Sequence, residues 1–212
     1  MNNGLFFWDN RFESGLDNSP RFTNRSATKV IPMNQTAAID LCSYMVMDNL
    51  ALARMAEELG KIDDAKKFQN QAEELKKLVN ENLWDEKDGL YYDYDFRTGN
   101  LVRIKTIASL LPLFAGIPDR ARASRLRDHI MNPKQFNSLL PFPSVSLDDP
   151  FFELDMWRGP VWINTAYMVI LGLEDYGYKK EASELSWKIV DGVFQVWKKT
   201  GKFYEFYHPQ KF

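Results

Sequence analysis

Two acidic side chains near opposite ends of the chain have neighbours suited to acid–base chemistry. Asp17 lies in FESGLDNSPRF, residues 12–22, where a glycine and the turn-forming Asn-Ser-Pro are flanked by aromatic rings. Glu205 lies in FYEFY, residues 203–207. Apolar surroundings disfavour the charged form of a carboxyl group, and a protonated carboxyl can act as a general acid. The alternatives are that Asp17 only shapes a turn and that Glu205 is an exposed residue of an extended segment.

Two carboxyl groups that face each other across a pocket can cleave a glycosidic bond. One protonates the leaving oxygen, and the other activates water or attacks the sugar. Asp17 and Glu205 are the best candidates, and Asp93 is a weaker rival to Glu205. The other acidic candidates, for which structural roles are expected, are Glu13, Asp40 and Glu153. The side chains predicted to bind the sugar and orient its polar groups are Trp8, Phe12, Arg21, Trp157, Arg158, Trp162 and Tyr204.

The run MWRGPVWIN, residues 156–164, places two tryptophans around an arginine where a helix is expected to start. Arg158 can orient a carboxylate, from the protein or from a substrate, through paired hydrogen bonds. Trp157 and Trp162 can stack on a sugar ring, or they can simply pack between helices. Aromatic residues make up 14% of the chain, more than a plain helical core requires.

Composition excludes several other classes of function. The 212 residues carry a formal net charge of −2, which gives no electrostatic footprint for nucleic acid. One cysteine and two histidines provide neither an internal disulfide nor a zinc signature. Asp148-Asp149 resembles half of a magnesium-binding motif, but it lies in a proline-rich loop without a second acidic cluster. No membrane-spanning run or leader is found, so we expect a cytoplasmic protein. No metal motif is convincing, so we expect neither a metal nor a cofactor.

Apolar residues recur at helical spacing over most of the chain. Short extended segments are expected at residues 89–94 and 201–207. The spacing predicts an all-α protein with six helices, over residues 36–59, 63–83, 104–114, 119–131, 160–176 and 179–199.

A repeat underlies these helices. Gly60, Gly116 and Gly177 each end one helix, and an alanine follows five residues later inside the next helix. Stacked αα-hairpins of this kind build toroids or solenoids. The uniformly apolar helices would form an inner ring and the amphipathic ones an outer ring. The connecting loops of the units would then gather at one end, near Asp17 and Glu205.

These runs together resemble glycoside hydrolase family 63, the α-glucosidase group related to trehalases. The resemblance is closest to bacterial members that act on small α-glucosides, including the glucosylglycerate and mannosylglycerate hydrolases. It implies an (α/α)6 toroid and hydrolysis with inversion, with Asp17 as the general acid and Glu205 as the general base. The matching stretches are residues 13–21, 39–41, 105–116, 149–150, 157–164 and 203–207.

Two departures from the family pattern are visible. Cys42 stands where relatives usually have asparagine. The chain, residues 1–212, also has about half of the toroid's helices, with the early helices and the last helix expected to be missing. Exposed inner-helix surface would then favour self-association or a partner chain. The alternatives to a glycosidase are a non-catalytic toroid segment that binds carbohydrate or a partner, and a trehalase-like hydrolase whose uncharged substrate would not need Arg21 or Arg158.

Overall fold

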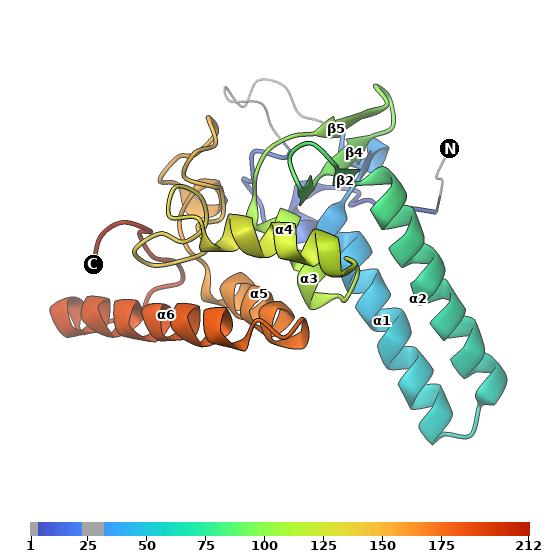
Figure 1. Ribbon diagram of the computed structural model, residues 1–212. Coiled ribbons are helices and arrows are strands. Elements are labelled where there is room, and N and C mark those ends of the chain that lie inside the picture. Colours follow the sequence, from blue (N-terminus) through green and yellow to red (C-terminus); the bar gives the residue numbers. More distant parts are fainter. Residues whose placement is uncertain (1–3, 23–31) are drawn as a thin grey trace.

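The computed structural model describes residues 4–22 and 32–212 (Figure 1). Within these ranges the chain forms six α-helices that follow one another as three hairpins. No helix there combines the length and apolar character needed to cross a bilayer. The helices are α1 (Ile39–Glu58), α2 (Ile62–Asn82), α3 (Leu111–Phe114), α4 (Arg120–Met131), α5 (Ile163–Asp175) and α6 (Lys179–Thr200).

Each hairpin turns at the glycine that the sequence repeat predicted. Gly60, Gly116 and Gly177 follow α1, α3 and α5, with φ angles of 69°, 63° and 87°. These lie in the left-handed region, where a side chain would be strained and glycine is not. The expected helix–glycine–helix units are therefore confirmed.

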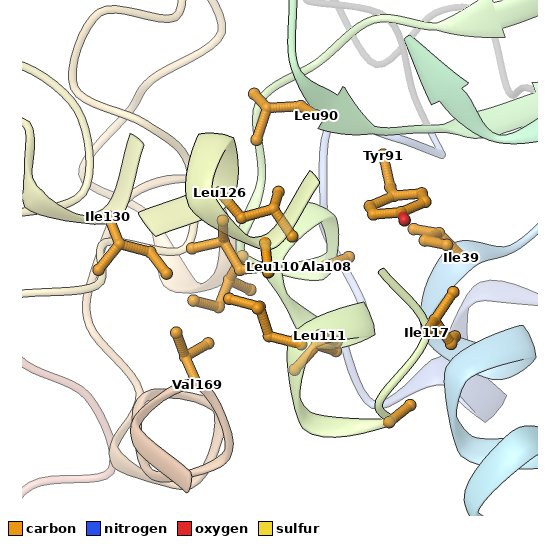
Figure 2. Packing of buried hydrophobic residues seen from close by; sticks show 14 of the residues in the cluster. Ile39, Leu90, Tyr91, Ala108, Leu110, Leu111, Ile117, Leu126, Ile130 and Val169 are labelled. Carbon is orange, nitrogen blue, oxygen red and sulfur yellow. The ribbon is translucent and has the colours of Figure 1, made fainter. Parts of the chain in front are cut away.

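The first helices of the three hairpins pack successively, with α3 between α1 and α5. Helix α2 packs against α1, and α6 packs against α5. The core that joins them is apolar, and Figure 2 shows Leu126 and Ile130 of α4 pointing towards Leu110 and Val169. The three hairpins are thus joined through their first helices, and the inner and outer rings expected from the sequence remain a prediction. A closed toroid remains a prediction.

Short strands lie beside the start of α1. β1 (Thr36–Ala37), β4 (Asp93–Asp95) and β5 (Asn100–Val102) form an antiparallel sheet in the order β1-β4-β5. Thr36 pairs with Asp95 in this sheet, so Asp93 is brought next to the first turn of α1. β2 (Trp84–Asp85) and β3 (Leu90–Tyr91) form a separate hairpin.

Two predicted helix starts are wrong, for the same physical reason. The first helix starts at Ile39 instead of residue 36, because Thr36 and Ala37 pair with β4. The fifth starts at Ile163 instead of Pro160, because Val161 bridges to both Pro143 and Tyr207. In both places backbone pairing across the chain overrides local helical signals.

The predicted third helix, residues 104–114, also starts later, at Ile107, and is divided. A 3₁₀ turn η3 (Ile107–Leu110) precedes the short α3, and Pro112 stands in the first turn of α3. Proline suits this position because its missing N–H has no intrahelical acceptor there.

The contact of α5 with α3 gives a test of the hairpin array. A Cβ added at Gly172 would lie 2.7 Å from the Phe114 backbone nitrogen and 2.8 Å from the Leu113 carbonyl carbon. Backbone atoms cannot move aside cheaply, so Gly172→Ala is expected to lower the free energy of unfolding by about 1–3 kcal/mol in urea titrations.

Gly192→Ala is the matched control in α6. Its added Cβ would meet only the ends of side chains, Leu140 and Phe212, which can shift. Since alanine also favours helix by about 1 kcal/mol, little net loss is expected. Equal losses for the two variants would contradict this packing.

Candidate active site

Asp17 lies in a tight loop whose flanking residues are anchored in the core. The 3₁₀ turn η1 (Arg11–Ser14) ends at Gly15, which is left-handed with φ of 68°. Ser19 N donates to Leu16 O at 2.8 Å, and the side chain of Leu16 is buried. Asp17 itself is half-buried. Local hydrogen bonding and one apolar anchor thus hold the backbone around this carboxyl group.

Glu13 has the structural role that the sequence predicted. Its carboxylate accepts hydrogen bonds from the backbone of Asp9 and Asn10 and from the side chain of Asn10. Together with the Asn10 side chain it forms a capping box on η1. Glu13 is therefore committed to the turn, which leaves Asp17 as the acidic candidate of this loop.

An aromatic stack lies beneath this loop. The rings of Trp157 and Trp162 are parallel, with centroids 3.8 Å apart and planes 7° apart. Leu16, Phe22 and Met33 complete a buried cluster with them, and Trp8 packs against it. The two tryptophans therefore pack on each other and on side chains of the Asp17 loop, a packing that neither alternative from the sequence described.

The segment that carries Glu205 rests on the same stack. The Phe206 ring lies 5.1 Å from that of Trp162, and Tyr207 exchanges two backbone hydrogen bonds with Val161, at 2.8 and 2.9 Å. Glu205 is exposed between these anchors and Tyr204. The chain therefore brings the two carboxylate-bearing segments, remote in sequence, onto one aromatic support.

Arg158 is held by a protein carboxylate. Its Nε donates to Glu153 Oε2 at 2.8 Å and its Nη2 to Glu153 Oε1 at 3.3 Å, the paired geometry that the sequence suggested. Nη1 donates to the backbone oxygen of Asn18 at 3.3 Å. Arg158 thereby ties the Asp17 loop to the turn formed by residues 155–158, and Glu153 has the structural role expected of it.

Arg21 closes the loop through a buried charge cluster. The residue is only 2% exposed, and its guanidinium donates to Asp40 Oδ2 at 2.6 Å and to Asp93 Oδ1 at 2.9 Å. Asp93 Oδ1 also accepts from Ile39 N, and Asp40 Oδ1 accepts from the Trp8 indole. Asp40 thus has a structural role, and Asp93 is buried, unlike Glu205, which is exposed.

Burial sets the protonation of this cluster. Two carboxylates share one guanidinium, and burial, opposed by Arg21, raises the pKa of Asp93 to about 6. Cys42 lies close by, where its Sγ meets the backbone nitrogen of Phe6 at 3.4 Å, and burial raises the pKa of this thiol to about 12. Cys42 therefore provides a neutral contact at the position where the family pattern has asparagine.

The predicted sugar-binding residues divide by exposure. Phe12 and Tyr204 are 66% and 46% exposed, so their rings can meet a ligand from solvent. Trp8 is half-buried. The remaining four are buried and engaged with other protein groups: Arg21, Trp157, Arg158 and Trp162.

Asn18 was missed as a site residue by sequence reasoning. Its Asn-Ser-Pro context predicts only a turn, yet its side chain forms hydrogen bonds with Asp155 and Trp157. Local sequence patterns do not predict contacts between segments that are so far apart in the chain.

The acidic pair Asp148-Asp149 is committed to the protein. Asp148 pairs with Lys105 at 2.8 Å and accepts from Ser146 and Gln135. Asp149 accepts from the backbone nitrogens of residues 105 and 151. In the part of the chain that the structure describes, no three His, Cys, Asp or Glu side chains gather as they would around a metal ion.

Comparison with known proteins identifies the family of this hairpin array. The family model described as "Mannosylglycerate hydrolase MGH1-like glycoside hydrolase domain" matches residues 1–211. A mannosylglycerate hydrolase of Thermus thermophilus is 43% identical over 106 residues, which are 50% of this chain and 25% of that protein. A probable mannosyl-oligosaccharide glucosidase of Schizosaccharomyces pombe is 30% identical over a match that covers 92% of this chain and 26% of its own length.

A solved structure agrees with these relatives. The GH63 mannosylglycerate hydrolase of another Thermus thermophilus strain, crystallised with glucose, superposes with a TM-score of 0.82 and 27% identity. The match covers 98% of this chain and 57% of that one, so the chain spans little more than half the length of this relative and less of the curated ones. The architecture is that of the helical glycoside hydrolases. The chain belongs to the MGH1-like glycoside hydrolase domain family, within GH63.

The charge cluster predicts how stability depends on pH. Because the pKa of Asp93 is raised on folding, the folded chain binds more protons than the unfolded chain between about pH 4 and 6. The contribution of Asp93 to the free energy of unfolding should therefore decrease as pH rises through this window. Urea titrations of the Asp93→Asn variant should not show this decrease.

Asp95→Asn is the control on the same strand. Hydrogen bonds from Arg97 lower the pKa of Asp95, so its contribution is lost only as pH falls below the usual carboxyl range. This variant should keep the wild-type slope between pH 4 and 6. Parallel stability curves for wild type and Asp93→Asn would contradict the assignment.

Proposed function

We propose that this chain carries the catalytic pair of an inverting glycoside hydrolase that cleaves a small α-linked glucoside. Asp17 is the general acid and Glu205 the general base. One observation carries the proposal: Leu16 and Phe206, the neighbours of the two carboxylates, both belong with the Trp157–Trp162 stack. The names of the relatives support a glycosidase, and their glycerate-linked substrate supports a small glycoside.

The mechanism assigns one proton transfer to each carboxyl group. Asp17 gives its proton to the glycosidic oxygen as the bond to the sugar breaks. Glu205, which solvent reaches, takes a proton from the water that attacks the opposite face of the ring. Inversion requires the two groups to be about 6.5–9.5 Å apart, so that this water fits between them. Phe12 and Tyr204 provide exposed rings for the apolar faces of the substrate.

A trehalase-like activity on an uncharged disaccharide is the second candidate. Arg21 and Arg158, the two arginines expected at the site, both pair with protein carboxylates. This pairing favours an uncharged substrate, which needs no arginine to bind a carboxylate. Comparing hydrolysis of glucosylglycerate and trehalose separates the two. Calorimetric binding of glucose without turnover of either would instead indicate a non-catalytic carbohydrate-binding segment.

We also propose that residues 1–212 are one toroid-type domain that associates with a second copy. Trp187, Val190, Phe194 and Trp197 recur at helical spacing along α6, and all are exposed. Val190, Phe194 and Trp197, together with Phe203, line an apolar groove of about 480 Å³. A contiguous apolar surface of this kind marks an interaction site. In a closed ring, further hairpins would cover it.

The catalytic roles can be tested with two substrates. Asp17→Asn should lose about 100-fold or more of its kcat on glucosylglycerate, because a general acid contributes about 10²–10⁴-fold. It should lose much less on α-glucosyl fluoride, since fluoride departs with little help from a proton. Glu205→Gln should lose turnover of both. The measurement is steady-state sugar release, with circular dichroism to confirm folding.

Near-full turnover of glucosylglycerate by either folded variant would show that the pair is wrongly assigned. Equal losses of Asp17→Asn on both substrates would show that this residue is not the acid.

Self-association is tested by sedimentation velocity. The wild-type chain should sediment as a dimer at micromolar concentration. Phe194→Glu places a charge in the centre of the α6 face and should shift the chain towards monomer. Asn70→Asp, which adds the same charge at an exposed position of α2, should remain dimeric. A monomeric wild type would contradict the proposal.

A further inference from the structure

Asn18, next to the proposed acid, bonds to a distant turn through both its side chain and its backbone. Its Nδ2 donates to Asp155 Oδ2 at 2.8 Å, and its Oδ1 accepts from Trp157 N at 2.9 Å. Its backbone oxygen accepts from Arg158 Nη1 at 3.3 Å. One residue thus makes at least three bonds to the turn formed by residues 155–158, which we name the Trp157 turn.

The Trp157 turn leads on to the proposed base. Trp157, whose backbone nitrogen is held by Asn18, stacks on Trp162, and Trp162 contacts Phe206 beside Glu205. A continuous series of contacts therefore joins the residue after the acid to the residue after the base. A displacement at one end of this series can reach the other end through packed side chains.

The Trp157 turn is itself held in a strained conformation. Met156 has a φ of 39°, in the left-handed region that a bulky side chain rarely adopts. Its backbone oxygen accepts from the Trp162 indole at 3.0 Å, and Arg158 N donates to Asp155 O at 2.8 Å. Strain persists where the surroundings over-determine it, and it concentrates at functional sites. A turn fixed in this way is a firm support for the bonds to Asn18.

We infer that Asn18 is a positioning residue that sets the placement of Asp17 relative to Glu205 by fastening the Asp17 loop to the Trp157 turn. This inference rests on the proposed function for its catalytic consequence, but the mechanical link stands on the hydrogen bonds. In an inverting hydrolase the separation of the two carboxyl groups must admit one water. On the side of the proposed acid, the hydrogen bonds of Asn18 keep Asp17 at that separation from Glu205.

The catalytic consequence is measured with Asn18→Ala. A misplacement of about 1 Å can cost about 100-fold, so kcat on glucosylglycerate should fall by about 10- to 100-fold. The loss on α-glucosyl fluoride should be several-fold smaller, because displacement of the acid matters little there. A change that merely loosened the fold would reduce both rates together. Equal losses on both substrates, or no loss on glucosylglycerate, would overturn the catalytic role.

The mechanical link is measured by hydrogen–deuterium exchange, which needs no activity. Asn18→Ala should raise exchange both in residues 14–22 and in residues 155–162, because the side-chain hydrogen bonds between the two segments are lost. Ser14→Ala is the matched control: it removes two hydrogen bonds inside the loop, to Arg11 O and from Leu16 N, and none to the Trp157 turn. It should raise exchange only in the first segment.

The two experiments fail separately. A wild-type chain that hydrolyses neither substrate contradicts the proposed function, and the exchange data then decide the link alone. Unchanged exchange in residues 155–162 of Asn18→Ala would overturn the link itself, whatever the activity. Raised exchange in both segments with the unequal rate losses is the result expected.

Discussion

The parallel contact of Trp157 with Trp162 is the interaction on which the rest of the site depends. Two buried indoles in offset or parallel contact contribute large apolar area and about 0.5–1.5 kcal/mol beyond it. They matter here mainly because segments from both ends of the chain pack against them. Leu16 and Phe22 pack with the pair in one cluster, and Phe206 contacts Trp162. A hairpin array alone would leave these ends apart.

A second constraint acts at the base of the Asp17 loop. Breaking a buried ion pair from one side is expensive, because the partner is left charged and without compensation. The guanidinium of Arg21 meets two carboxylates, one on α1 and one on β4, so the loop, the first helix and the small sheet are fastened at one point. Such a cluster adds little net stability compared with apolar packing, but it defines which residues must meet. The Trp8 indole donates a hydrogen bond to Asp40, and Trp8 also packs against the cluster of Trp157 and Trp162. The aromatic cluster is thereby linked to the charge cluster.

Much of the fold could be predicted from the sequence, because helical periodicity and glycine stops are local signals. The three glycine turns, the six helical regions and the extended segment around Tyr91 are found where the pattern indicated. Helix starts at residues 36 and 160 were placed too early, since pairing of Thr36 with Asp95 and of Val161 with Tyr207 depends on remote partners. The resemblance of motifs located the family, which comparison confirms. The burial of Arg21 and the contacts of Asn18 could not be foreseen, because both arise from side chains meeting across the fold.

The proposed base lies on a short strap rather than on a helix. After Gly201 the chain leaves α6 and is next fixed by the contact of Phe206 with Trp162, by the bridge of Tyr207 to Val161, and then by the hydrogen bond from Leu140 N to Pro209 O. Residues 202–205, before these fixed points, make no regular structure. Their number can therefore change without disturbing the helical core. A strap one residue longer or shorter would move its carboxylate relative to the Asp17 loop, so the spacing of the proposed catalytic pair can evolve separately from the scaffold that supports it.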